Sequence, residues 1–131
     1  MRLSGPRAFE VVGVLASASE QGAGAAGHLS RGLAKGRIVL GGGASFACMV
    51  AAFPAPGSYT GEDVVEFFVP GNPHLVERIM RLAIERVDGV RLATPGEFTA
   101  RAYFNKRLTL EQAEGVAALI AAQNASELAE A

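Results

Sequence analysis

Two stretches decide the fold: residues 58–68, SYTGEDVVEFF, and residues 95–114, PGEFTARAYFNKRLTLEQAE. Both place polar residues directly beside turn signals. In the first stretch Glu66 lies inside the apolar run Val64, Val65, Phe67 and Phe68. A carboxylate inside such a run is costly unless donors bind it. We therefore expect the side chains of the second stretch to converge on the first.

The second stretch supplies candidate partners for this carboxylate in the basic cluster Arg101, Lys106 and Arg107. In one interpretation Glu66 forms a structural salt bridge with Arg101 or Arg107, and residues 62–63 form a solvated acidic turn. In the other, the carboxylate and the basic cluster together hold an anionic or polar ligand. The residues alone favour the structural interpretation and leave the ligand site open.

Catalytic and metal chemistry find little support in the residue pattern. Glu62 and Glu66 as a general acid–base pair is a weak alternative, and no Ser/His/Asp or Cys/His arrangement supports a nucleophile. The single cysteine, Cys48, lies in an apolar run and is expected to be a small buried hydrophobe. His28 and His74 show no metal-ligand spacing. No GxxxxGK[ST] motif is present, so no GTPase activity is expected from this chain.

Composition indicates one soluble globular domain. Of 131 residues, 50% are hydrophobic and 19% charged, and a chain of this size buries roughly two-thirds of its unfolded surface. The net charge of −1 predicts no broad basic field for nucleic acid or anionic membrane. No apolar run is long enough for a membrane span and no signal peptide is recognisable, which favours a cytoplasmic protein.

Periodicity and turn signals predict an α+β fold with helices on one side of a sheet. One strand is expected to end near residue 4. Further strands are expected at residues 37–40, 45–53, 64–69 and 90–93, with a hairpin turn at residues 41–44. The expected helices cover residues 6–16, 73–87, 95–105 and 110–130. Asn72 and Pro73 are expected as the cap and first residue of the second helix, and Thr94/Glu97 and Thr109/Gln112 have the form of capping boxes. Residues 17–36 are expected to form a loop, with a short helical turn within residues 25–33.

Three segments, in this order, resemble the N-terminal domain of the tRNA-modification GTPase family MnmE, also called TrmE. They are RLSGPRAFE at residues 2–10, FPAPGSYTGEDVVE at residues 53–66 and ATPGEFTARAYFNKRLTLEQAEGVAALI at residues 93–120. The resemblance implies a single folate-binding domain like the tetrahydrofolate-binding domain of glycine-cleavage T-protein. That fold has a mixed sheet with packed helices, followed by a C-terminal helix.

The resemblance also implies a ligand, partners and contact residues. The family's folate contacts correspond to Arg2, Glu66 and Arg107, and the implied cofactor is 5-formyltetrahydrofolate or a related tetrahydrofolate. A carboxylate suits the adjacent N–H donors of a pterin, and a guanidinium suits the anionic glutamate tail. A homodimer, an MnmG-like flavoprotein partner and indirect involvement with tRNA in wobble-uridine modification are implied as well.

The resemblance divides the chain into residues 1–109, the folate-binding domain, and residues 110–131, the start of a helical domain. It also implies an earlier first strand, which precedes Met1 in the family. Where the family reads His-Gly-Gly-Pro, this chain reads Pro70-Gly71-Asn72-Pro73, so Asn72 is expected at a glycine position with positive φ. The alternative is a degenerate module that dimerises or binds proteins without folate, or a mis-started gene fragment.

Overall fold

The computed structural model describes residues 1–18 and 30–131. Its elements are β1 (Arg2–Ser4), α1 (Ala8–Leu15), β2 (Ala16–Ala18), β3 (Gly32–Gly41), β4 (Ala44–Phe53), β5 (Val64–Phe68), α2 (Pro73–Arg86), α3 (Glu97–Phe104), α4 (Leu110–Ala121) and α5 (Ala125–Glu130). Contacts divide the chain into two compact units. The first contains Met1–Ser58 and Glu62–Leu92, and the second contains Tyr59–Gly61 and Ala93–Ala131.

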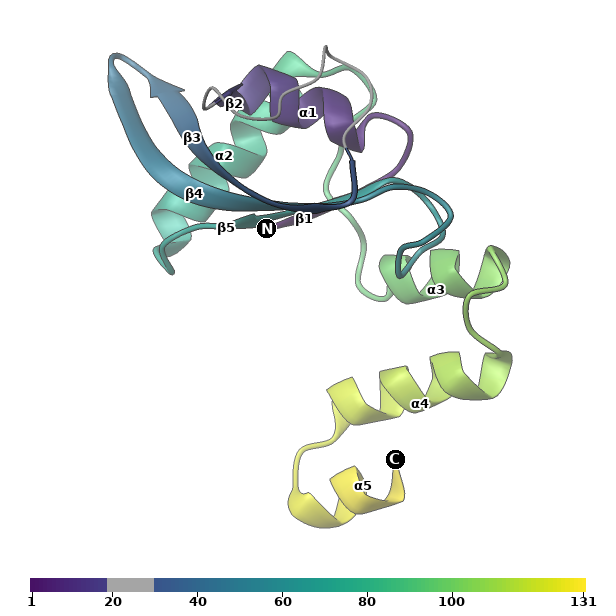
Figure 1. The fold of residues 1–131 in the computed structure, drawn as a ribbon. Helices are drawn as coiled ribbons and strands as arrows, with labels where there is room; N and C mark the ends of the chain where they lie inside the picture. Colours follow the sequence, from purple (N-terminus) through teal and green to yellow (C-terminus); the bar gives the residue numbers. More distant parts are fainter. Residues whose placement is uncertain (19–29) are drawn as a thin grey trace. The chain divides into compact units, whose positions relative to one another are not determined.

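The first unit is a five-stranded sheet in the order β1-β5-β4-β3-β2. Helices α1 and α2 lie together on one of its faces (Figure 1). Side chains alternate between the faces of a strand, and Val65 and Phe67 of β5 pack into the core with Phe9 and Ile79 from the helices. Glu66, which lies between Val65 and Phe67, is therefore on the sheet face opposite α1 and α2.

Local sequence signals explain where helix α2 begins. The side chain of Asn72 accepts hydrogen bonds from the backbone N–H groups of His74 and Leu75, and Pro73 occupies the first helical position. Both features stabilise a helix N-terminus. The expected cap role of Asn72 is confirmed, whereas the positive φ implied by the resemblance is wrong, because Asn72 has φ −98°.

The second unit consists of α3, α4 and α5 with the three residues Tyr59–Gly61. Helix α4 begins at the predicted capping box, in which Thr109 and Gln112 each bind the other's backbone N–H. At α3 the predicted box is only half formed: Glu97 accepts from the backbone N–H of Thr94, but Gly96 is the N-cap residue.

The α+β class is confirmed, and within the first unit the helices α1 and α2 lie on one side of the sheet as predicted. Each strand pairing in the described residues is antiparallel, whereas the resemblance implied a mixed sheet. The hairpin at residues 41–44 is confirmed by the pairing of Gly41 with Ala44. The division of the chain at residue 109 stays a prediction, and the contacts place residues 93–109 with the C-terminal helices.

Three expectations about individual elements are wrong. The predicted loop at residues 17–36 contains the end of β2 and the start of β3, because these strands pair with each other; the predicted helical turn at residues 25–33 lies largely outside the described residues. Residues 90–93 form no strand, since they have no strand partner. The long C-terminal helix is interrupted at residues 122–124, where the side chain of Asn124 caps a separate helix α5.

Candidate functional site

Arg2 and Glu66 form an ion pair on the sheet face opposite α1 and α2. Strand β1 pairs with β5 so that Arg2 stands directly opposite Glu66. The Nε and Nη2 atoms of Arg2 lie 2.8 and 2.7 Å from Oε1 of Glu66. Among the described residues no donor binds the second oxygen, Oε2. The Glu66 side chain is 23% exposed, so that oxygen can accept hydrogen bonds from a bound molecule.

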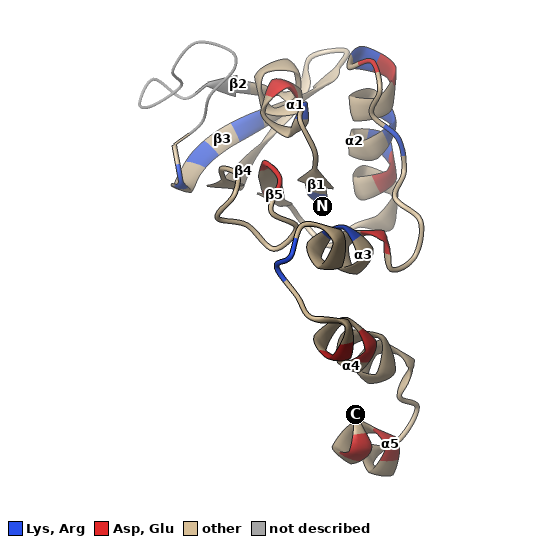
Figure 2. Cartoon of the chain, turned by 90° about the vertical axis from the view of Figure 1, so that its right-hand side faces the viewer, with Lys and Arg blue, Asp and Glu red and all other residues tan. Residues whose placement is uncertain are grey.

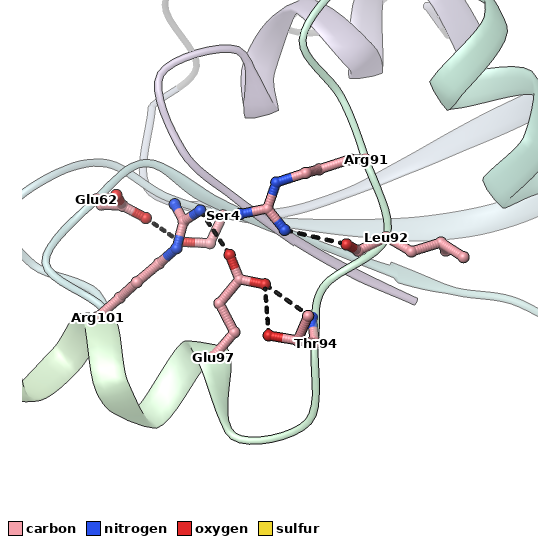
Figure 3. Close-up of polar contacts among 7 residues, drawn as sticks. All are labelled: Ser4, Glu62, Arg91, Leu92, Thr94, Glu97 and Arg101. Carbon is pink, nitrogen blue, oxygen red and sulfur yellow. Dashed lines mark hydrogen bonds and ion pairs between the residues drawn. The ribbon is translucent and has the colours of Figure 1, made fainter.

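The acidic turn before β5 is held by hydrogen bonds within the first unit. Ser4 Oγ donates to Oε2 of Glu62 at 2.7 Å, as the close-up shows (Figure 3). The backbone N–H of Gly5 donates to the carbonyl of Asp63 at 3.0 Å, and Oδ1 of Asp63 accepts from the backbone N–H of Ala55 at 2.8 Å. These bonds give Glu62 and Asp63 a structural role in positioning β1 beside β5.

Arg107 lies in the second unit, at the junction between α3 and α4. Its backbone N–H donates to the carbonyl of Ala102 at 2.8 Å. The stem of its side chain lies against Gly61, because a Cβ built on that glycine would be 3.3 Å from Arg107 Cγ. Beside it, Asn105 Nδ2 donates to the carbonyl of Thr60 at 2.7 Å. The backbone N–H and the side-chain stem of Arg107 thus both have contacts within the second unit.

Arg101, the other arginine proposed as a partner of Glu66, has a structural contact inside α3. Its Nη2 lies 2.9 Å from Oε1 of Glu97, one turn earlier in the helix (Figure 3). The second oxygen of Glu97 accepts from the backbone N–H of Thr94 at 2.8 Å. In the same view Arg91 Nη1 donates to the carbonyl of Leu92 at 3.1 Å. The segment leading into α3 is therefore braced by charge-assisted bonds.

Charge is unevenly distributed along the chain. Strand β3 carries Lys and Arg, whereas α4 and α5 carry Glu without basic residues (Figure 2). Burial raises the pKa of the Cys48 thiol, which favours its expected role as an inert core residue. In the described residues no group of three His, Cys, Asp or Glu side chains could hold a metal ion, and no helix there has the length and hydropathy to cross a membrane.

The structure brings two of the three predicted contact residues together. Arg2 and Glu66 bind each other directly, and Arg107 is held by neighbours of its own unit. The structural alternative had named Arg101 or Arg107 as the partner of Glu66, whereas the ion pair seen here is with Arg2. Sequence reasoning missed Asn105 and Thr60, whose bond joins segments that are distant in the sequence. The glycine at position 61 was the sequence signal that could have indicated a close backbone contact there.

Comparison with known proteins places these features in a family. The model of the family described as GTP-binding protein TrmE N-terminus matches residues 1–107. The tRNA modification GTPase MnmE of Bacteroides fragilis is 37% identical over 126 residues, which cover 96% of this chain and 27% of that protein. The protein of the same name from Ruegeria pomeroyi is 40% identical over 128 residues, 97% of this chain and 28% of its own length.

A third relative shows a shorter region of higher similarity. The tRNA modification GTPase MnmE of Aquifex aeolicus is 52% identical over 71 residues, 54% of this chain and 15% of that protein. The chain thus spans little more than a quarter of the length of the first relatives it matches. Because the family model covers most of the chain and two relatives align along nearly all of it, the chain belongs to the family of TrmE (MnmE) N-terminal domains.

Proposed function

We propose that this chain binds a tetrahydrofolate, with 5-formyltetrahydrofolate as the first form to test, and that it forms a homodimer. The observation that carries the proposal is the geometry of Glu66. Arg2 binds one carboxylate oxygen, and the other has no donor among the described residues. A carboxylate arranged in this way can accept the adjacent N–H donors of a pterin ring.

Arg107 supplies the second part of the proposed site. Arg107 is an exposed residue, and a guanidinium suits the carboxylates of the folate glutamate tail, which arginine binds through paired N–H donors. Arg2 contributes by orienting Glu66 and by contacting the ligand. Each of these side chains, taken by itself, thus has a chemistry that suits one part of a folate.

The wider role we propose is in the modification of the wobble uridine of tRNA. The relatives are named as tRNA modification GTPases, and this chain aligns with 27–28% of their length. The family model that it matches describes the N-terminus. GTP hydrolysis needs a phosphate-binding loop, and no GxxxxGK[ST] motif occurs in this sequence. The chain would supply folate binding and dimerisation in the cytoplasm, with an MnmG-like flavoprotein as partner and with tRNA engaged indirectly.

Calorimetric titration of the chain with 5-formyltetrahydrofolate tests the ligand. The informative variant is Glu66→Gln, which replaces one acceptor oxygen by an NH₂ donor and keeps the shape. We expect affinity to fall about 10-fold to 100-fold, the loss typical of a hydrogen bond to a charged group. The matched control is Glu77→Gln on α2, where the carboxylate pairs with Arg81 on an exposed helix surface; it should leave affinity unchanged.

Two results would contradict the proposal. A folded chain that gives no binding signal with folate supports the alternative of a module that assembles without a folate. Equal affinity in the Glu66→Gln variant would remove Glu66 from the site. Light scattering after size exclusion tests the dimer, for which we expect twice the 13.6 kDa chain mass, and a monomer at all concentrations would exclude it.

A further inference from the structure

A three-residue loop, Tyr59–Gly61, is bound to helix α3 and the segment that follows it. The hydroxyl groups of Tyr59 and Thr99 lie 2.9 Å apart and share a hydrogen bond. Asn105 Nδ2 donates to the carbonyl of Thr60 at 2.7 Å, and Thr60 is fully buried. The loop therefore has a defined position relative to the α3–α4 junction, within the second unit.

Gly61 brings the backbone of this loop against the side chain of Arg107. A Cβ on Gly61 would lie 3.1 Å from Asn105 Cβ, 3.3 Å from Arg107 Cγ and 3.6 Å from Arg107 Cδ. Gly61 also has φ +79°, a conformation that side chains disfavour. The missing side chain thus leaves the space in which the aliphatic part of Arg107 lies.

We propose that Asn105 and Gly61 are positioning residues for Arg107, an inference that rests on the proposed function of Arg107 in binding the anionic part of a folate. Arginine has many rotamers, and ordering them opposes binding. Packing of the Arg107 stem against Gly61 restricts those rotamers before the ligand arrives. Asn105 contributes by holding the loop in place through the Thr60 carbonyl. The pair thereby preorganises the guanidinium for a carboxylate or similar oxyanion.

A double-mutant cycle on folate affinity separates this role from a general effect on stability. The cycle compares the unmodified chain with Asn105→Ala, Arg107→Ala and the double variant, titrated with 5-formyltetrahydrofolate well below their unfolding temperatures. We expect Asn105→Ala to weaken binding about fivefold when Arg107 is present and to have no further effect in the Arg107→Ala background. Residues that share a contact partner, as Asn105 and Arg107 share Gly61, show coupling of this kind.

Two further variants complete the design. Asn105→Gln keeps an amide donor and should restore part of the affinity lost in Asn105→Ala. The matched control is Asn124→Ala, the same change at the cap of α5 in the same unit, and it should leave affinity unchanged. Thermal melts of each variant establish that the titrated chain is folded.

The outcomes distinguish this inference from the proposed function. Equal losses from Asn105→Ala with and without Arg107, or no loss at all, would overturn the positioning role while folate binding stands. Unchanged affinity in Arg107→Ala would show that Arg107 does not contact the folate. That result would overturn the positioning role as well. Loss in both single variants without further loss in the double variant supports it.

Discussion

Two nitrogen atoms of Arg2 bind one and the same oxygen of Glu66, at 2.8 and 2.7 Å, across neighbouring antiparallel strands. The contact is therefore not the symmetric fork in which arginine engages both carboxylate oxygens. Arg2 contacts Oε1 of Glu66, and Oε2 can accept hydrogen bonds from a ligand. The contribution of the ion pair to stability and the binding of a ligand by Glu66 can therefore be measured as separate effects.

The first prediction concerns the stability of this pair. The Arg2 side chain is 49% exposed, and exposed ion pairs contribute roughly 0.2–1 kcal/mol. We expect Arg2→Ala to lower the free energy of unfolding, measured by urea denaturation, by less than about 1 kcal/mol. The same variant should weaken folate binding, since Glu66 loses its orienting partner. A loss of several kcal/mol in stability would show instead that the pair is mainly structural.

The second prediction uses three glycines as a graded series. At Gly71 an added Cβ would have no described atom within 4 Å, and φ is not positive. Gly96 has equally open space but a φ of +78°. Gly61 has a φ of +79°, and its added Cβ would lie 3.1 Å from Asn105 Cβ. We expect Gly71→Ala to be nearly neutral, Gly96→Ala to cost about 1–2 kcal/mol from strain, and Gly61→Ala to cost more. Urea denaturation measures each value. An equal cost at Gly61 and Gly96 would show that the close contact relaxes freely.

The third prediction concerns Lys106, a residue other than glycine with positive φ, at +59°. It follows the end of α3, where glycine commonly takes this left-handed conformation. We expect Lys106→Gly to raise the free energy of unfolding by up to about 1 kcal/mol. Lys106→Ala, which removes the charge and keeps the strain, should give no such gain. Stabilisation by alanine as well would point to the charge as the cause.

The fourth prediction concerns Cys48, the single cysteine of the chain. The thiolate is the reactive form, and burial raises the pKa of this thiol. We expect alkylation of the folded chain at pH 8, followed by mass spectrometry, to be at least about tenfold slower than in urea, because the side chain is buried in the core. Equal rates would show that the core opens readily around β4.

The pH dependence at Cys48 follows from the same shift. The unfolded chain releases the thiol proton at lower pH than the folded chain, so this residue's contribution to stability is complete below the ordinary thiol pKa of about 8.5 and declines as the pH rises above it. A Cys48→Ala variant lacks that decline. Unfolding free energies of both chains between neutral and alkaline pH measure the difference, and parallel curves would contradict it.

The sequence predicted the elements whose signals are local. Asn72 before Pro73 located the start of α2, and the pair Thr109 and Gln112 located the start of α4, because caps act on neighbouring backbone groups. The hairpin at residues 41–44 was likewise marked by glycine. The start of β3 could not be predicted in this way. Its first residues include Gly32 and Gly36, which have low strand propensity, and the pairing with β4 decides their conformation.

The candidate site was predictable only in part. Glu66 was singled out because a carboxylate amid apolar strand residues is unusual. Its ion-pair partner depended on the register between β1 and β5, which residue patterns do not reveal across a large sequence separation. The contact between Asn105 and Thr60 depends in the same way on tertiary structure. Residue types thus identified the carboxylate, whereas its neighbours could be identified only from the fold.

The loop Tyr59–Gly61 makes the second unit discontinuous in sequence. The chain enters that unit for three residues, returns to supply β5 and α2 to the first unit, and re-enters at Ala93. A fragment that begins at Ala93 would lack the carbonyl that Asn105 binds and the tyrosine that meets Thr99. Limited proteolysis between residues 92 and 93 would therefore not yield two self-sufficient pieces. A module for engineering or transplanting the second unit must therefore contain both Tyr59–Gly61 and Ala93–Ala131.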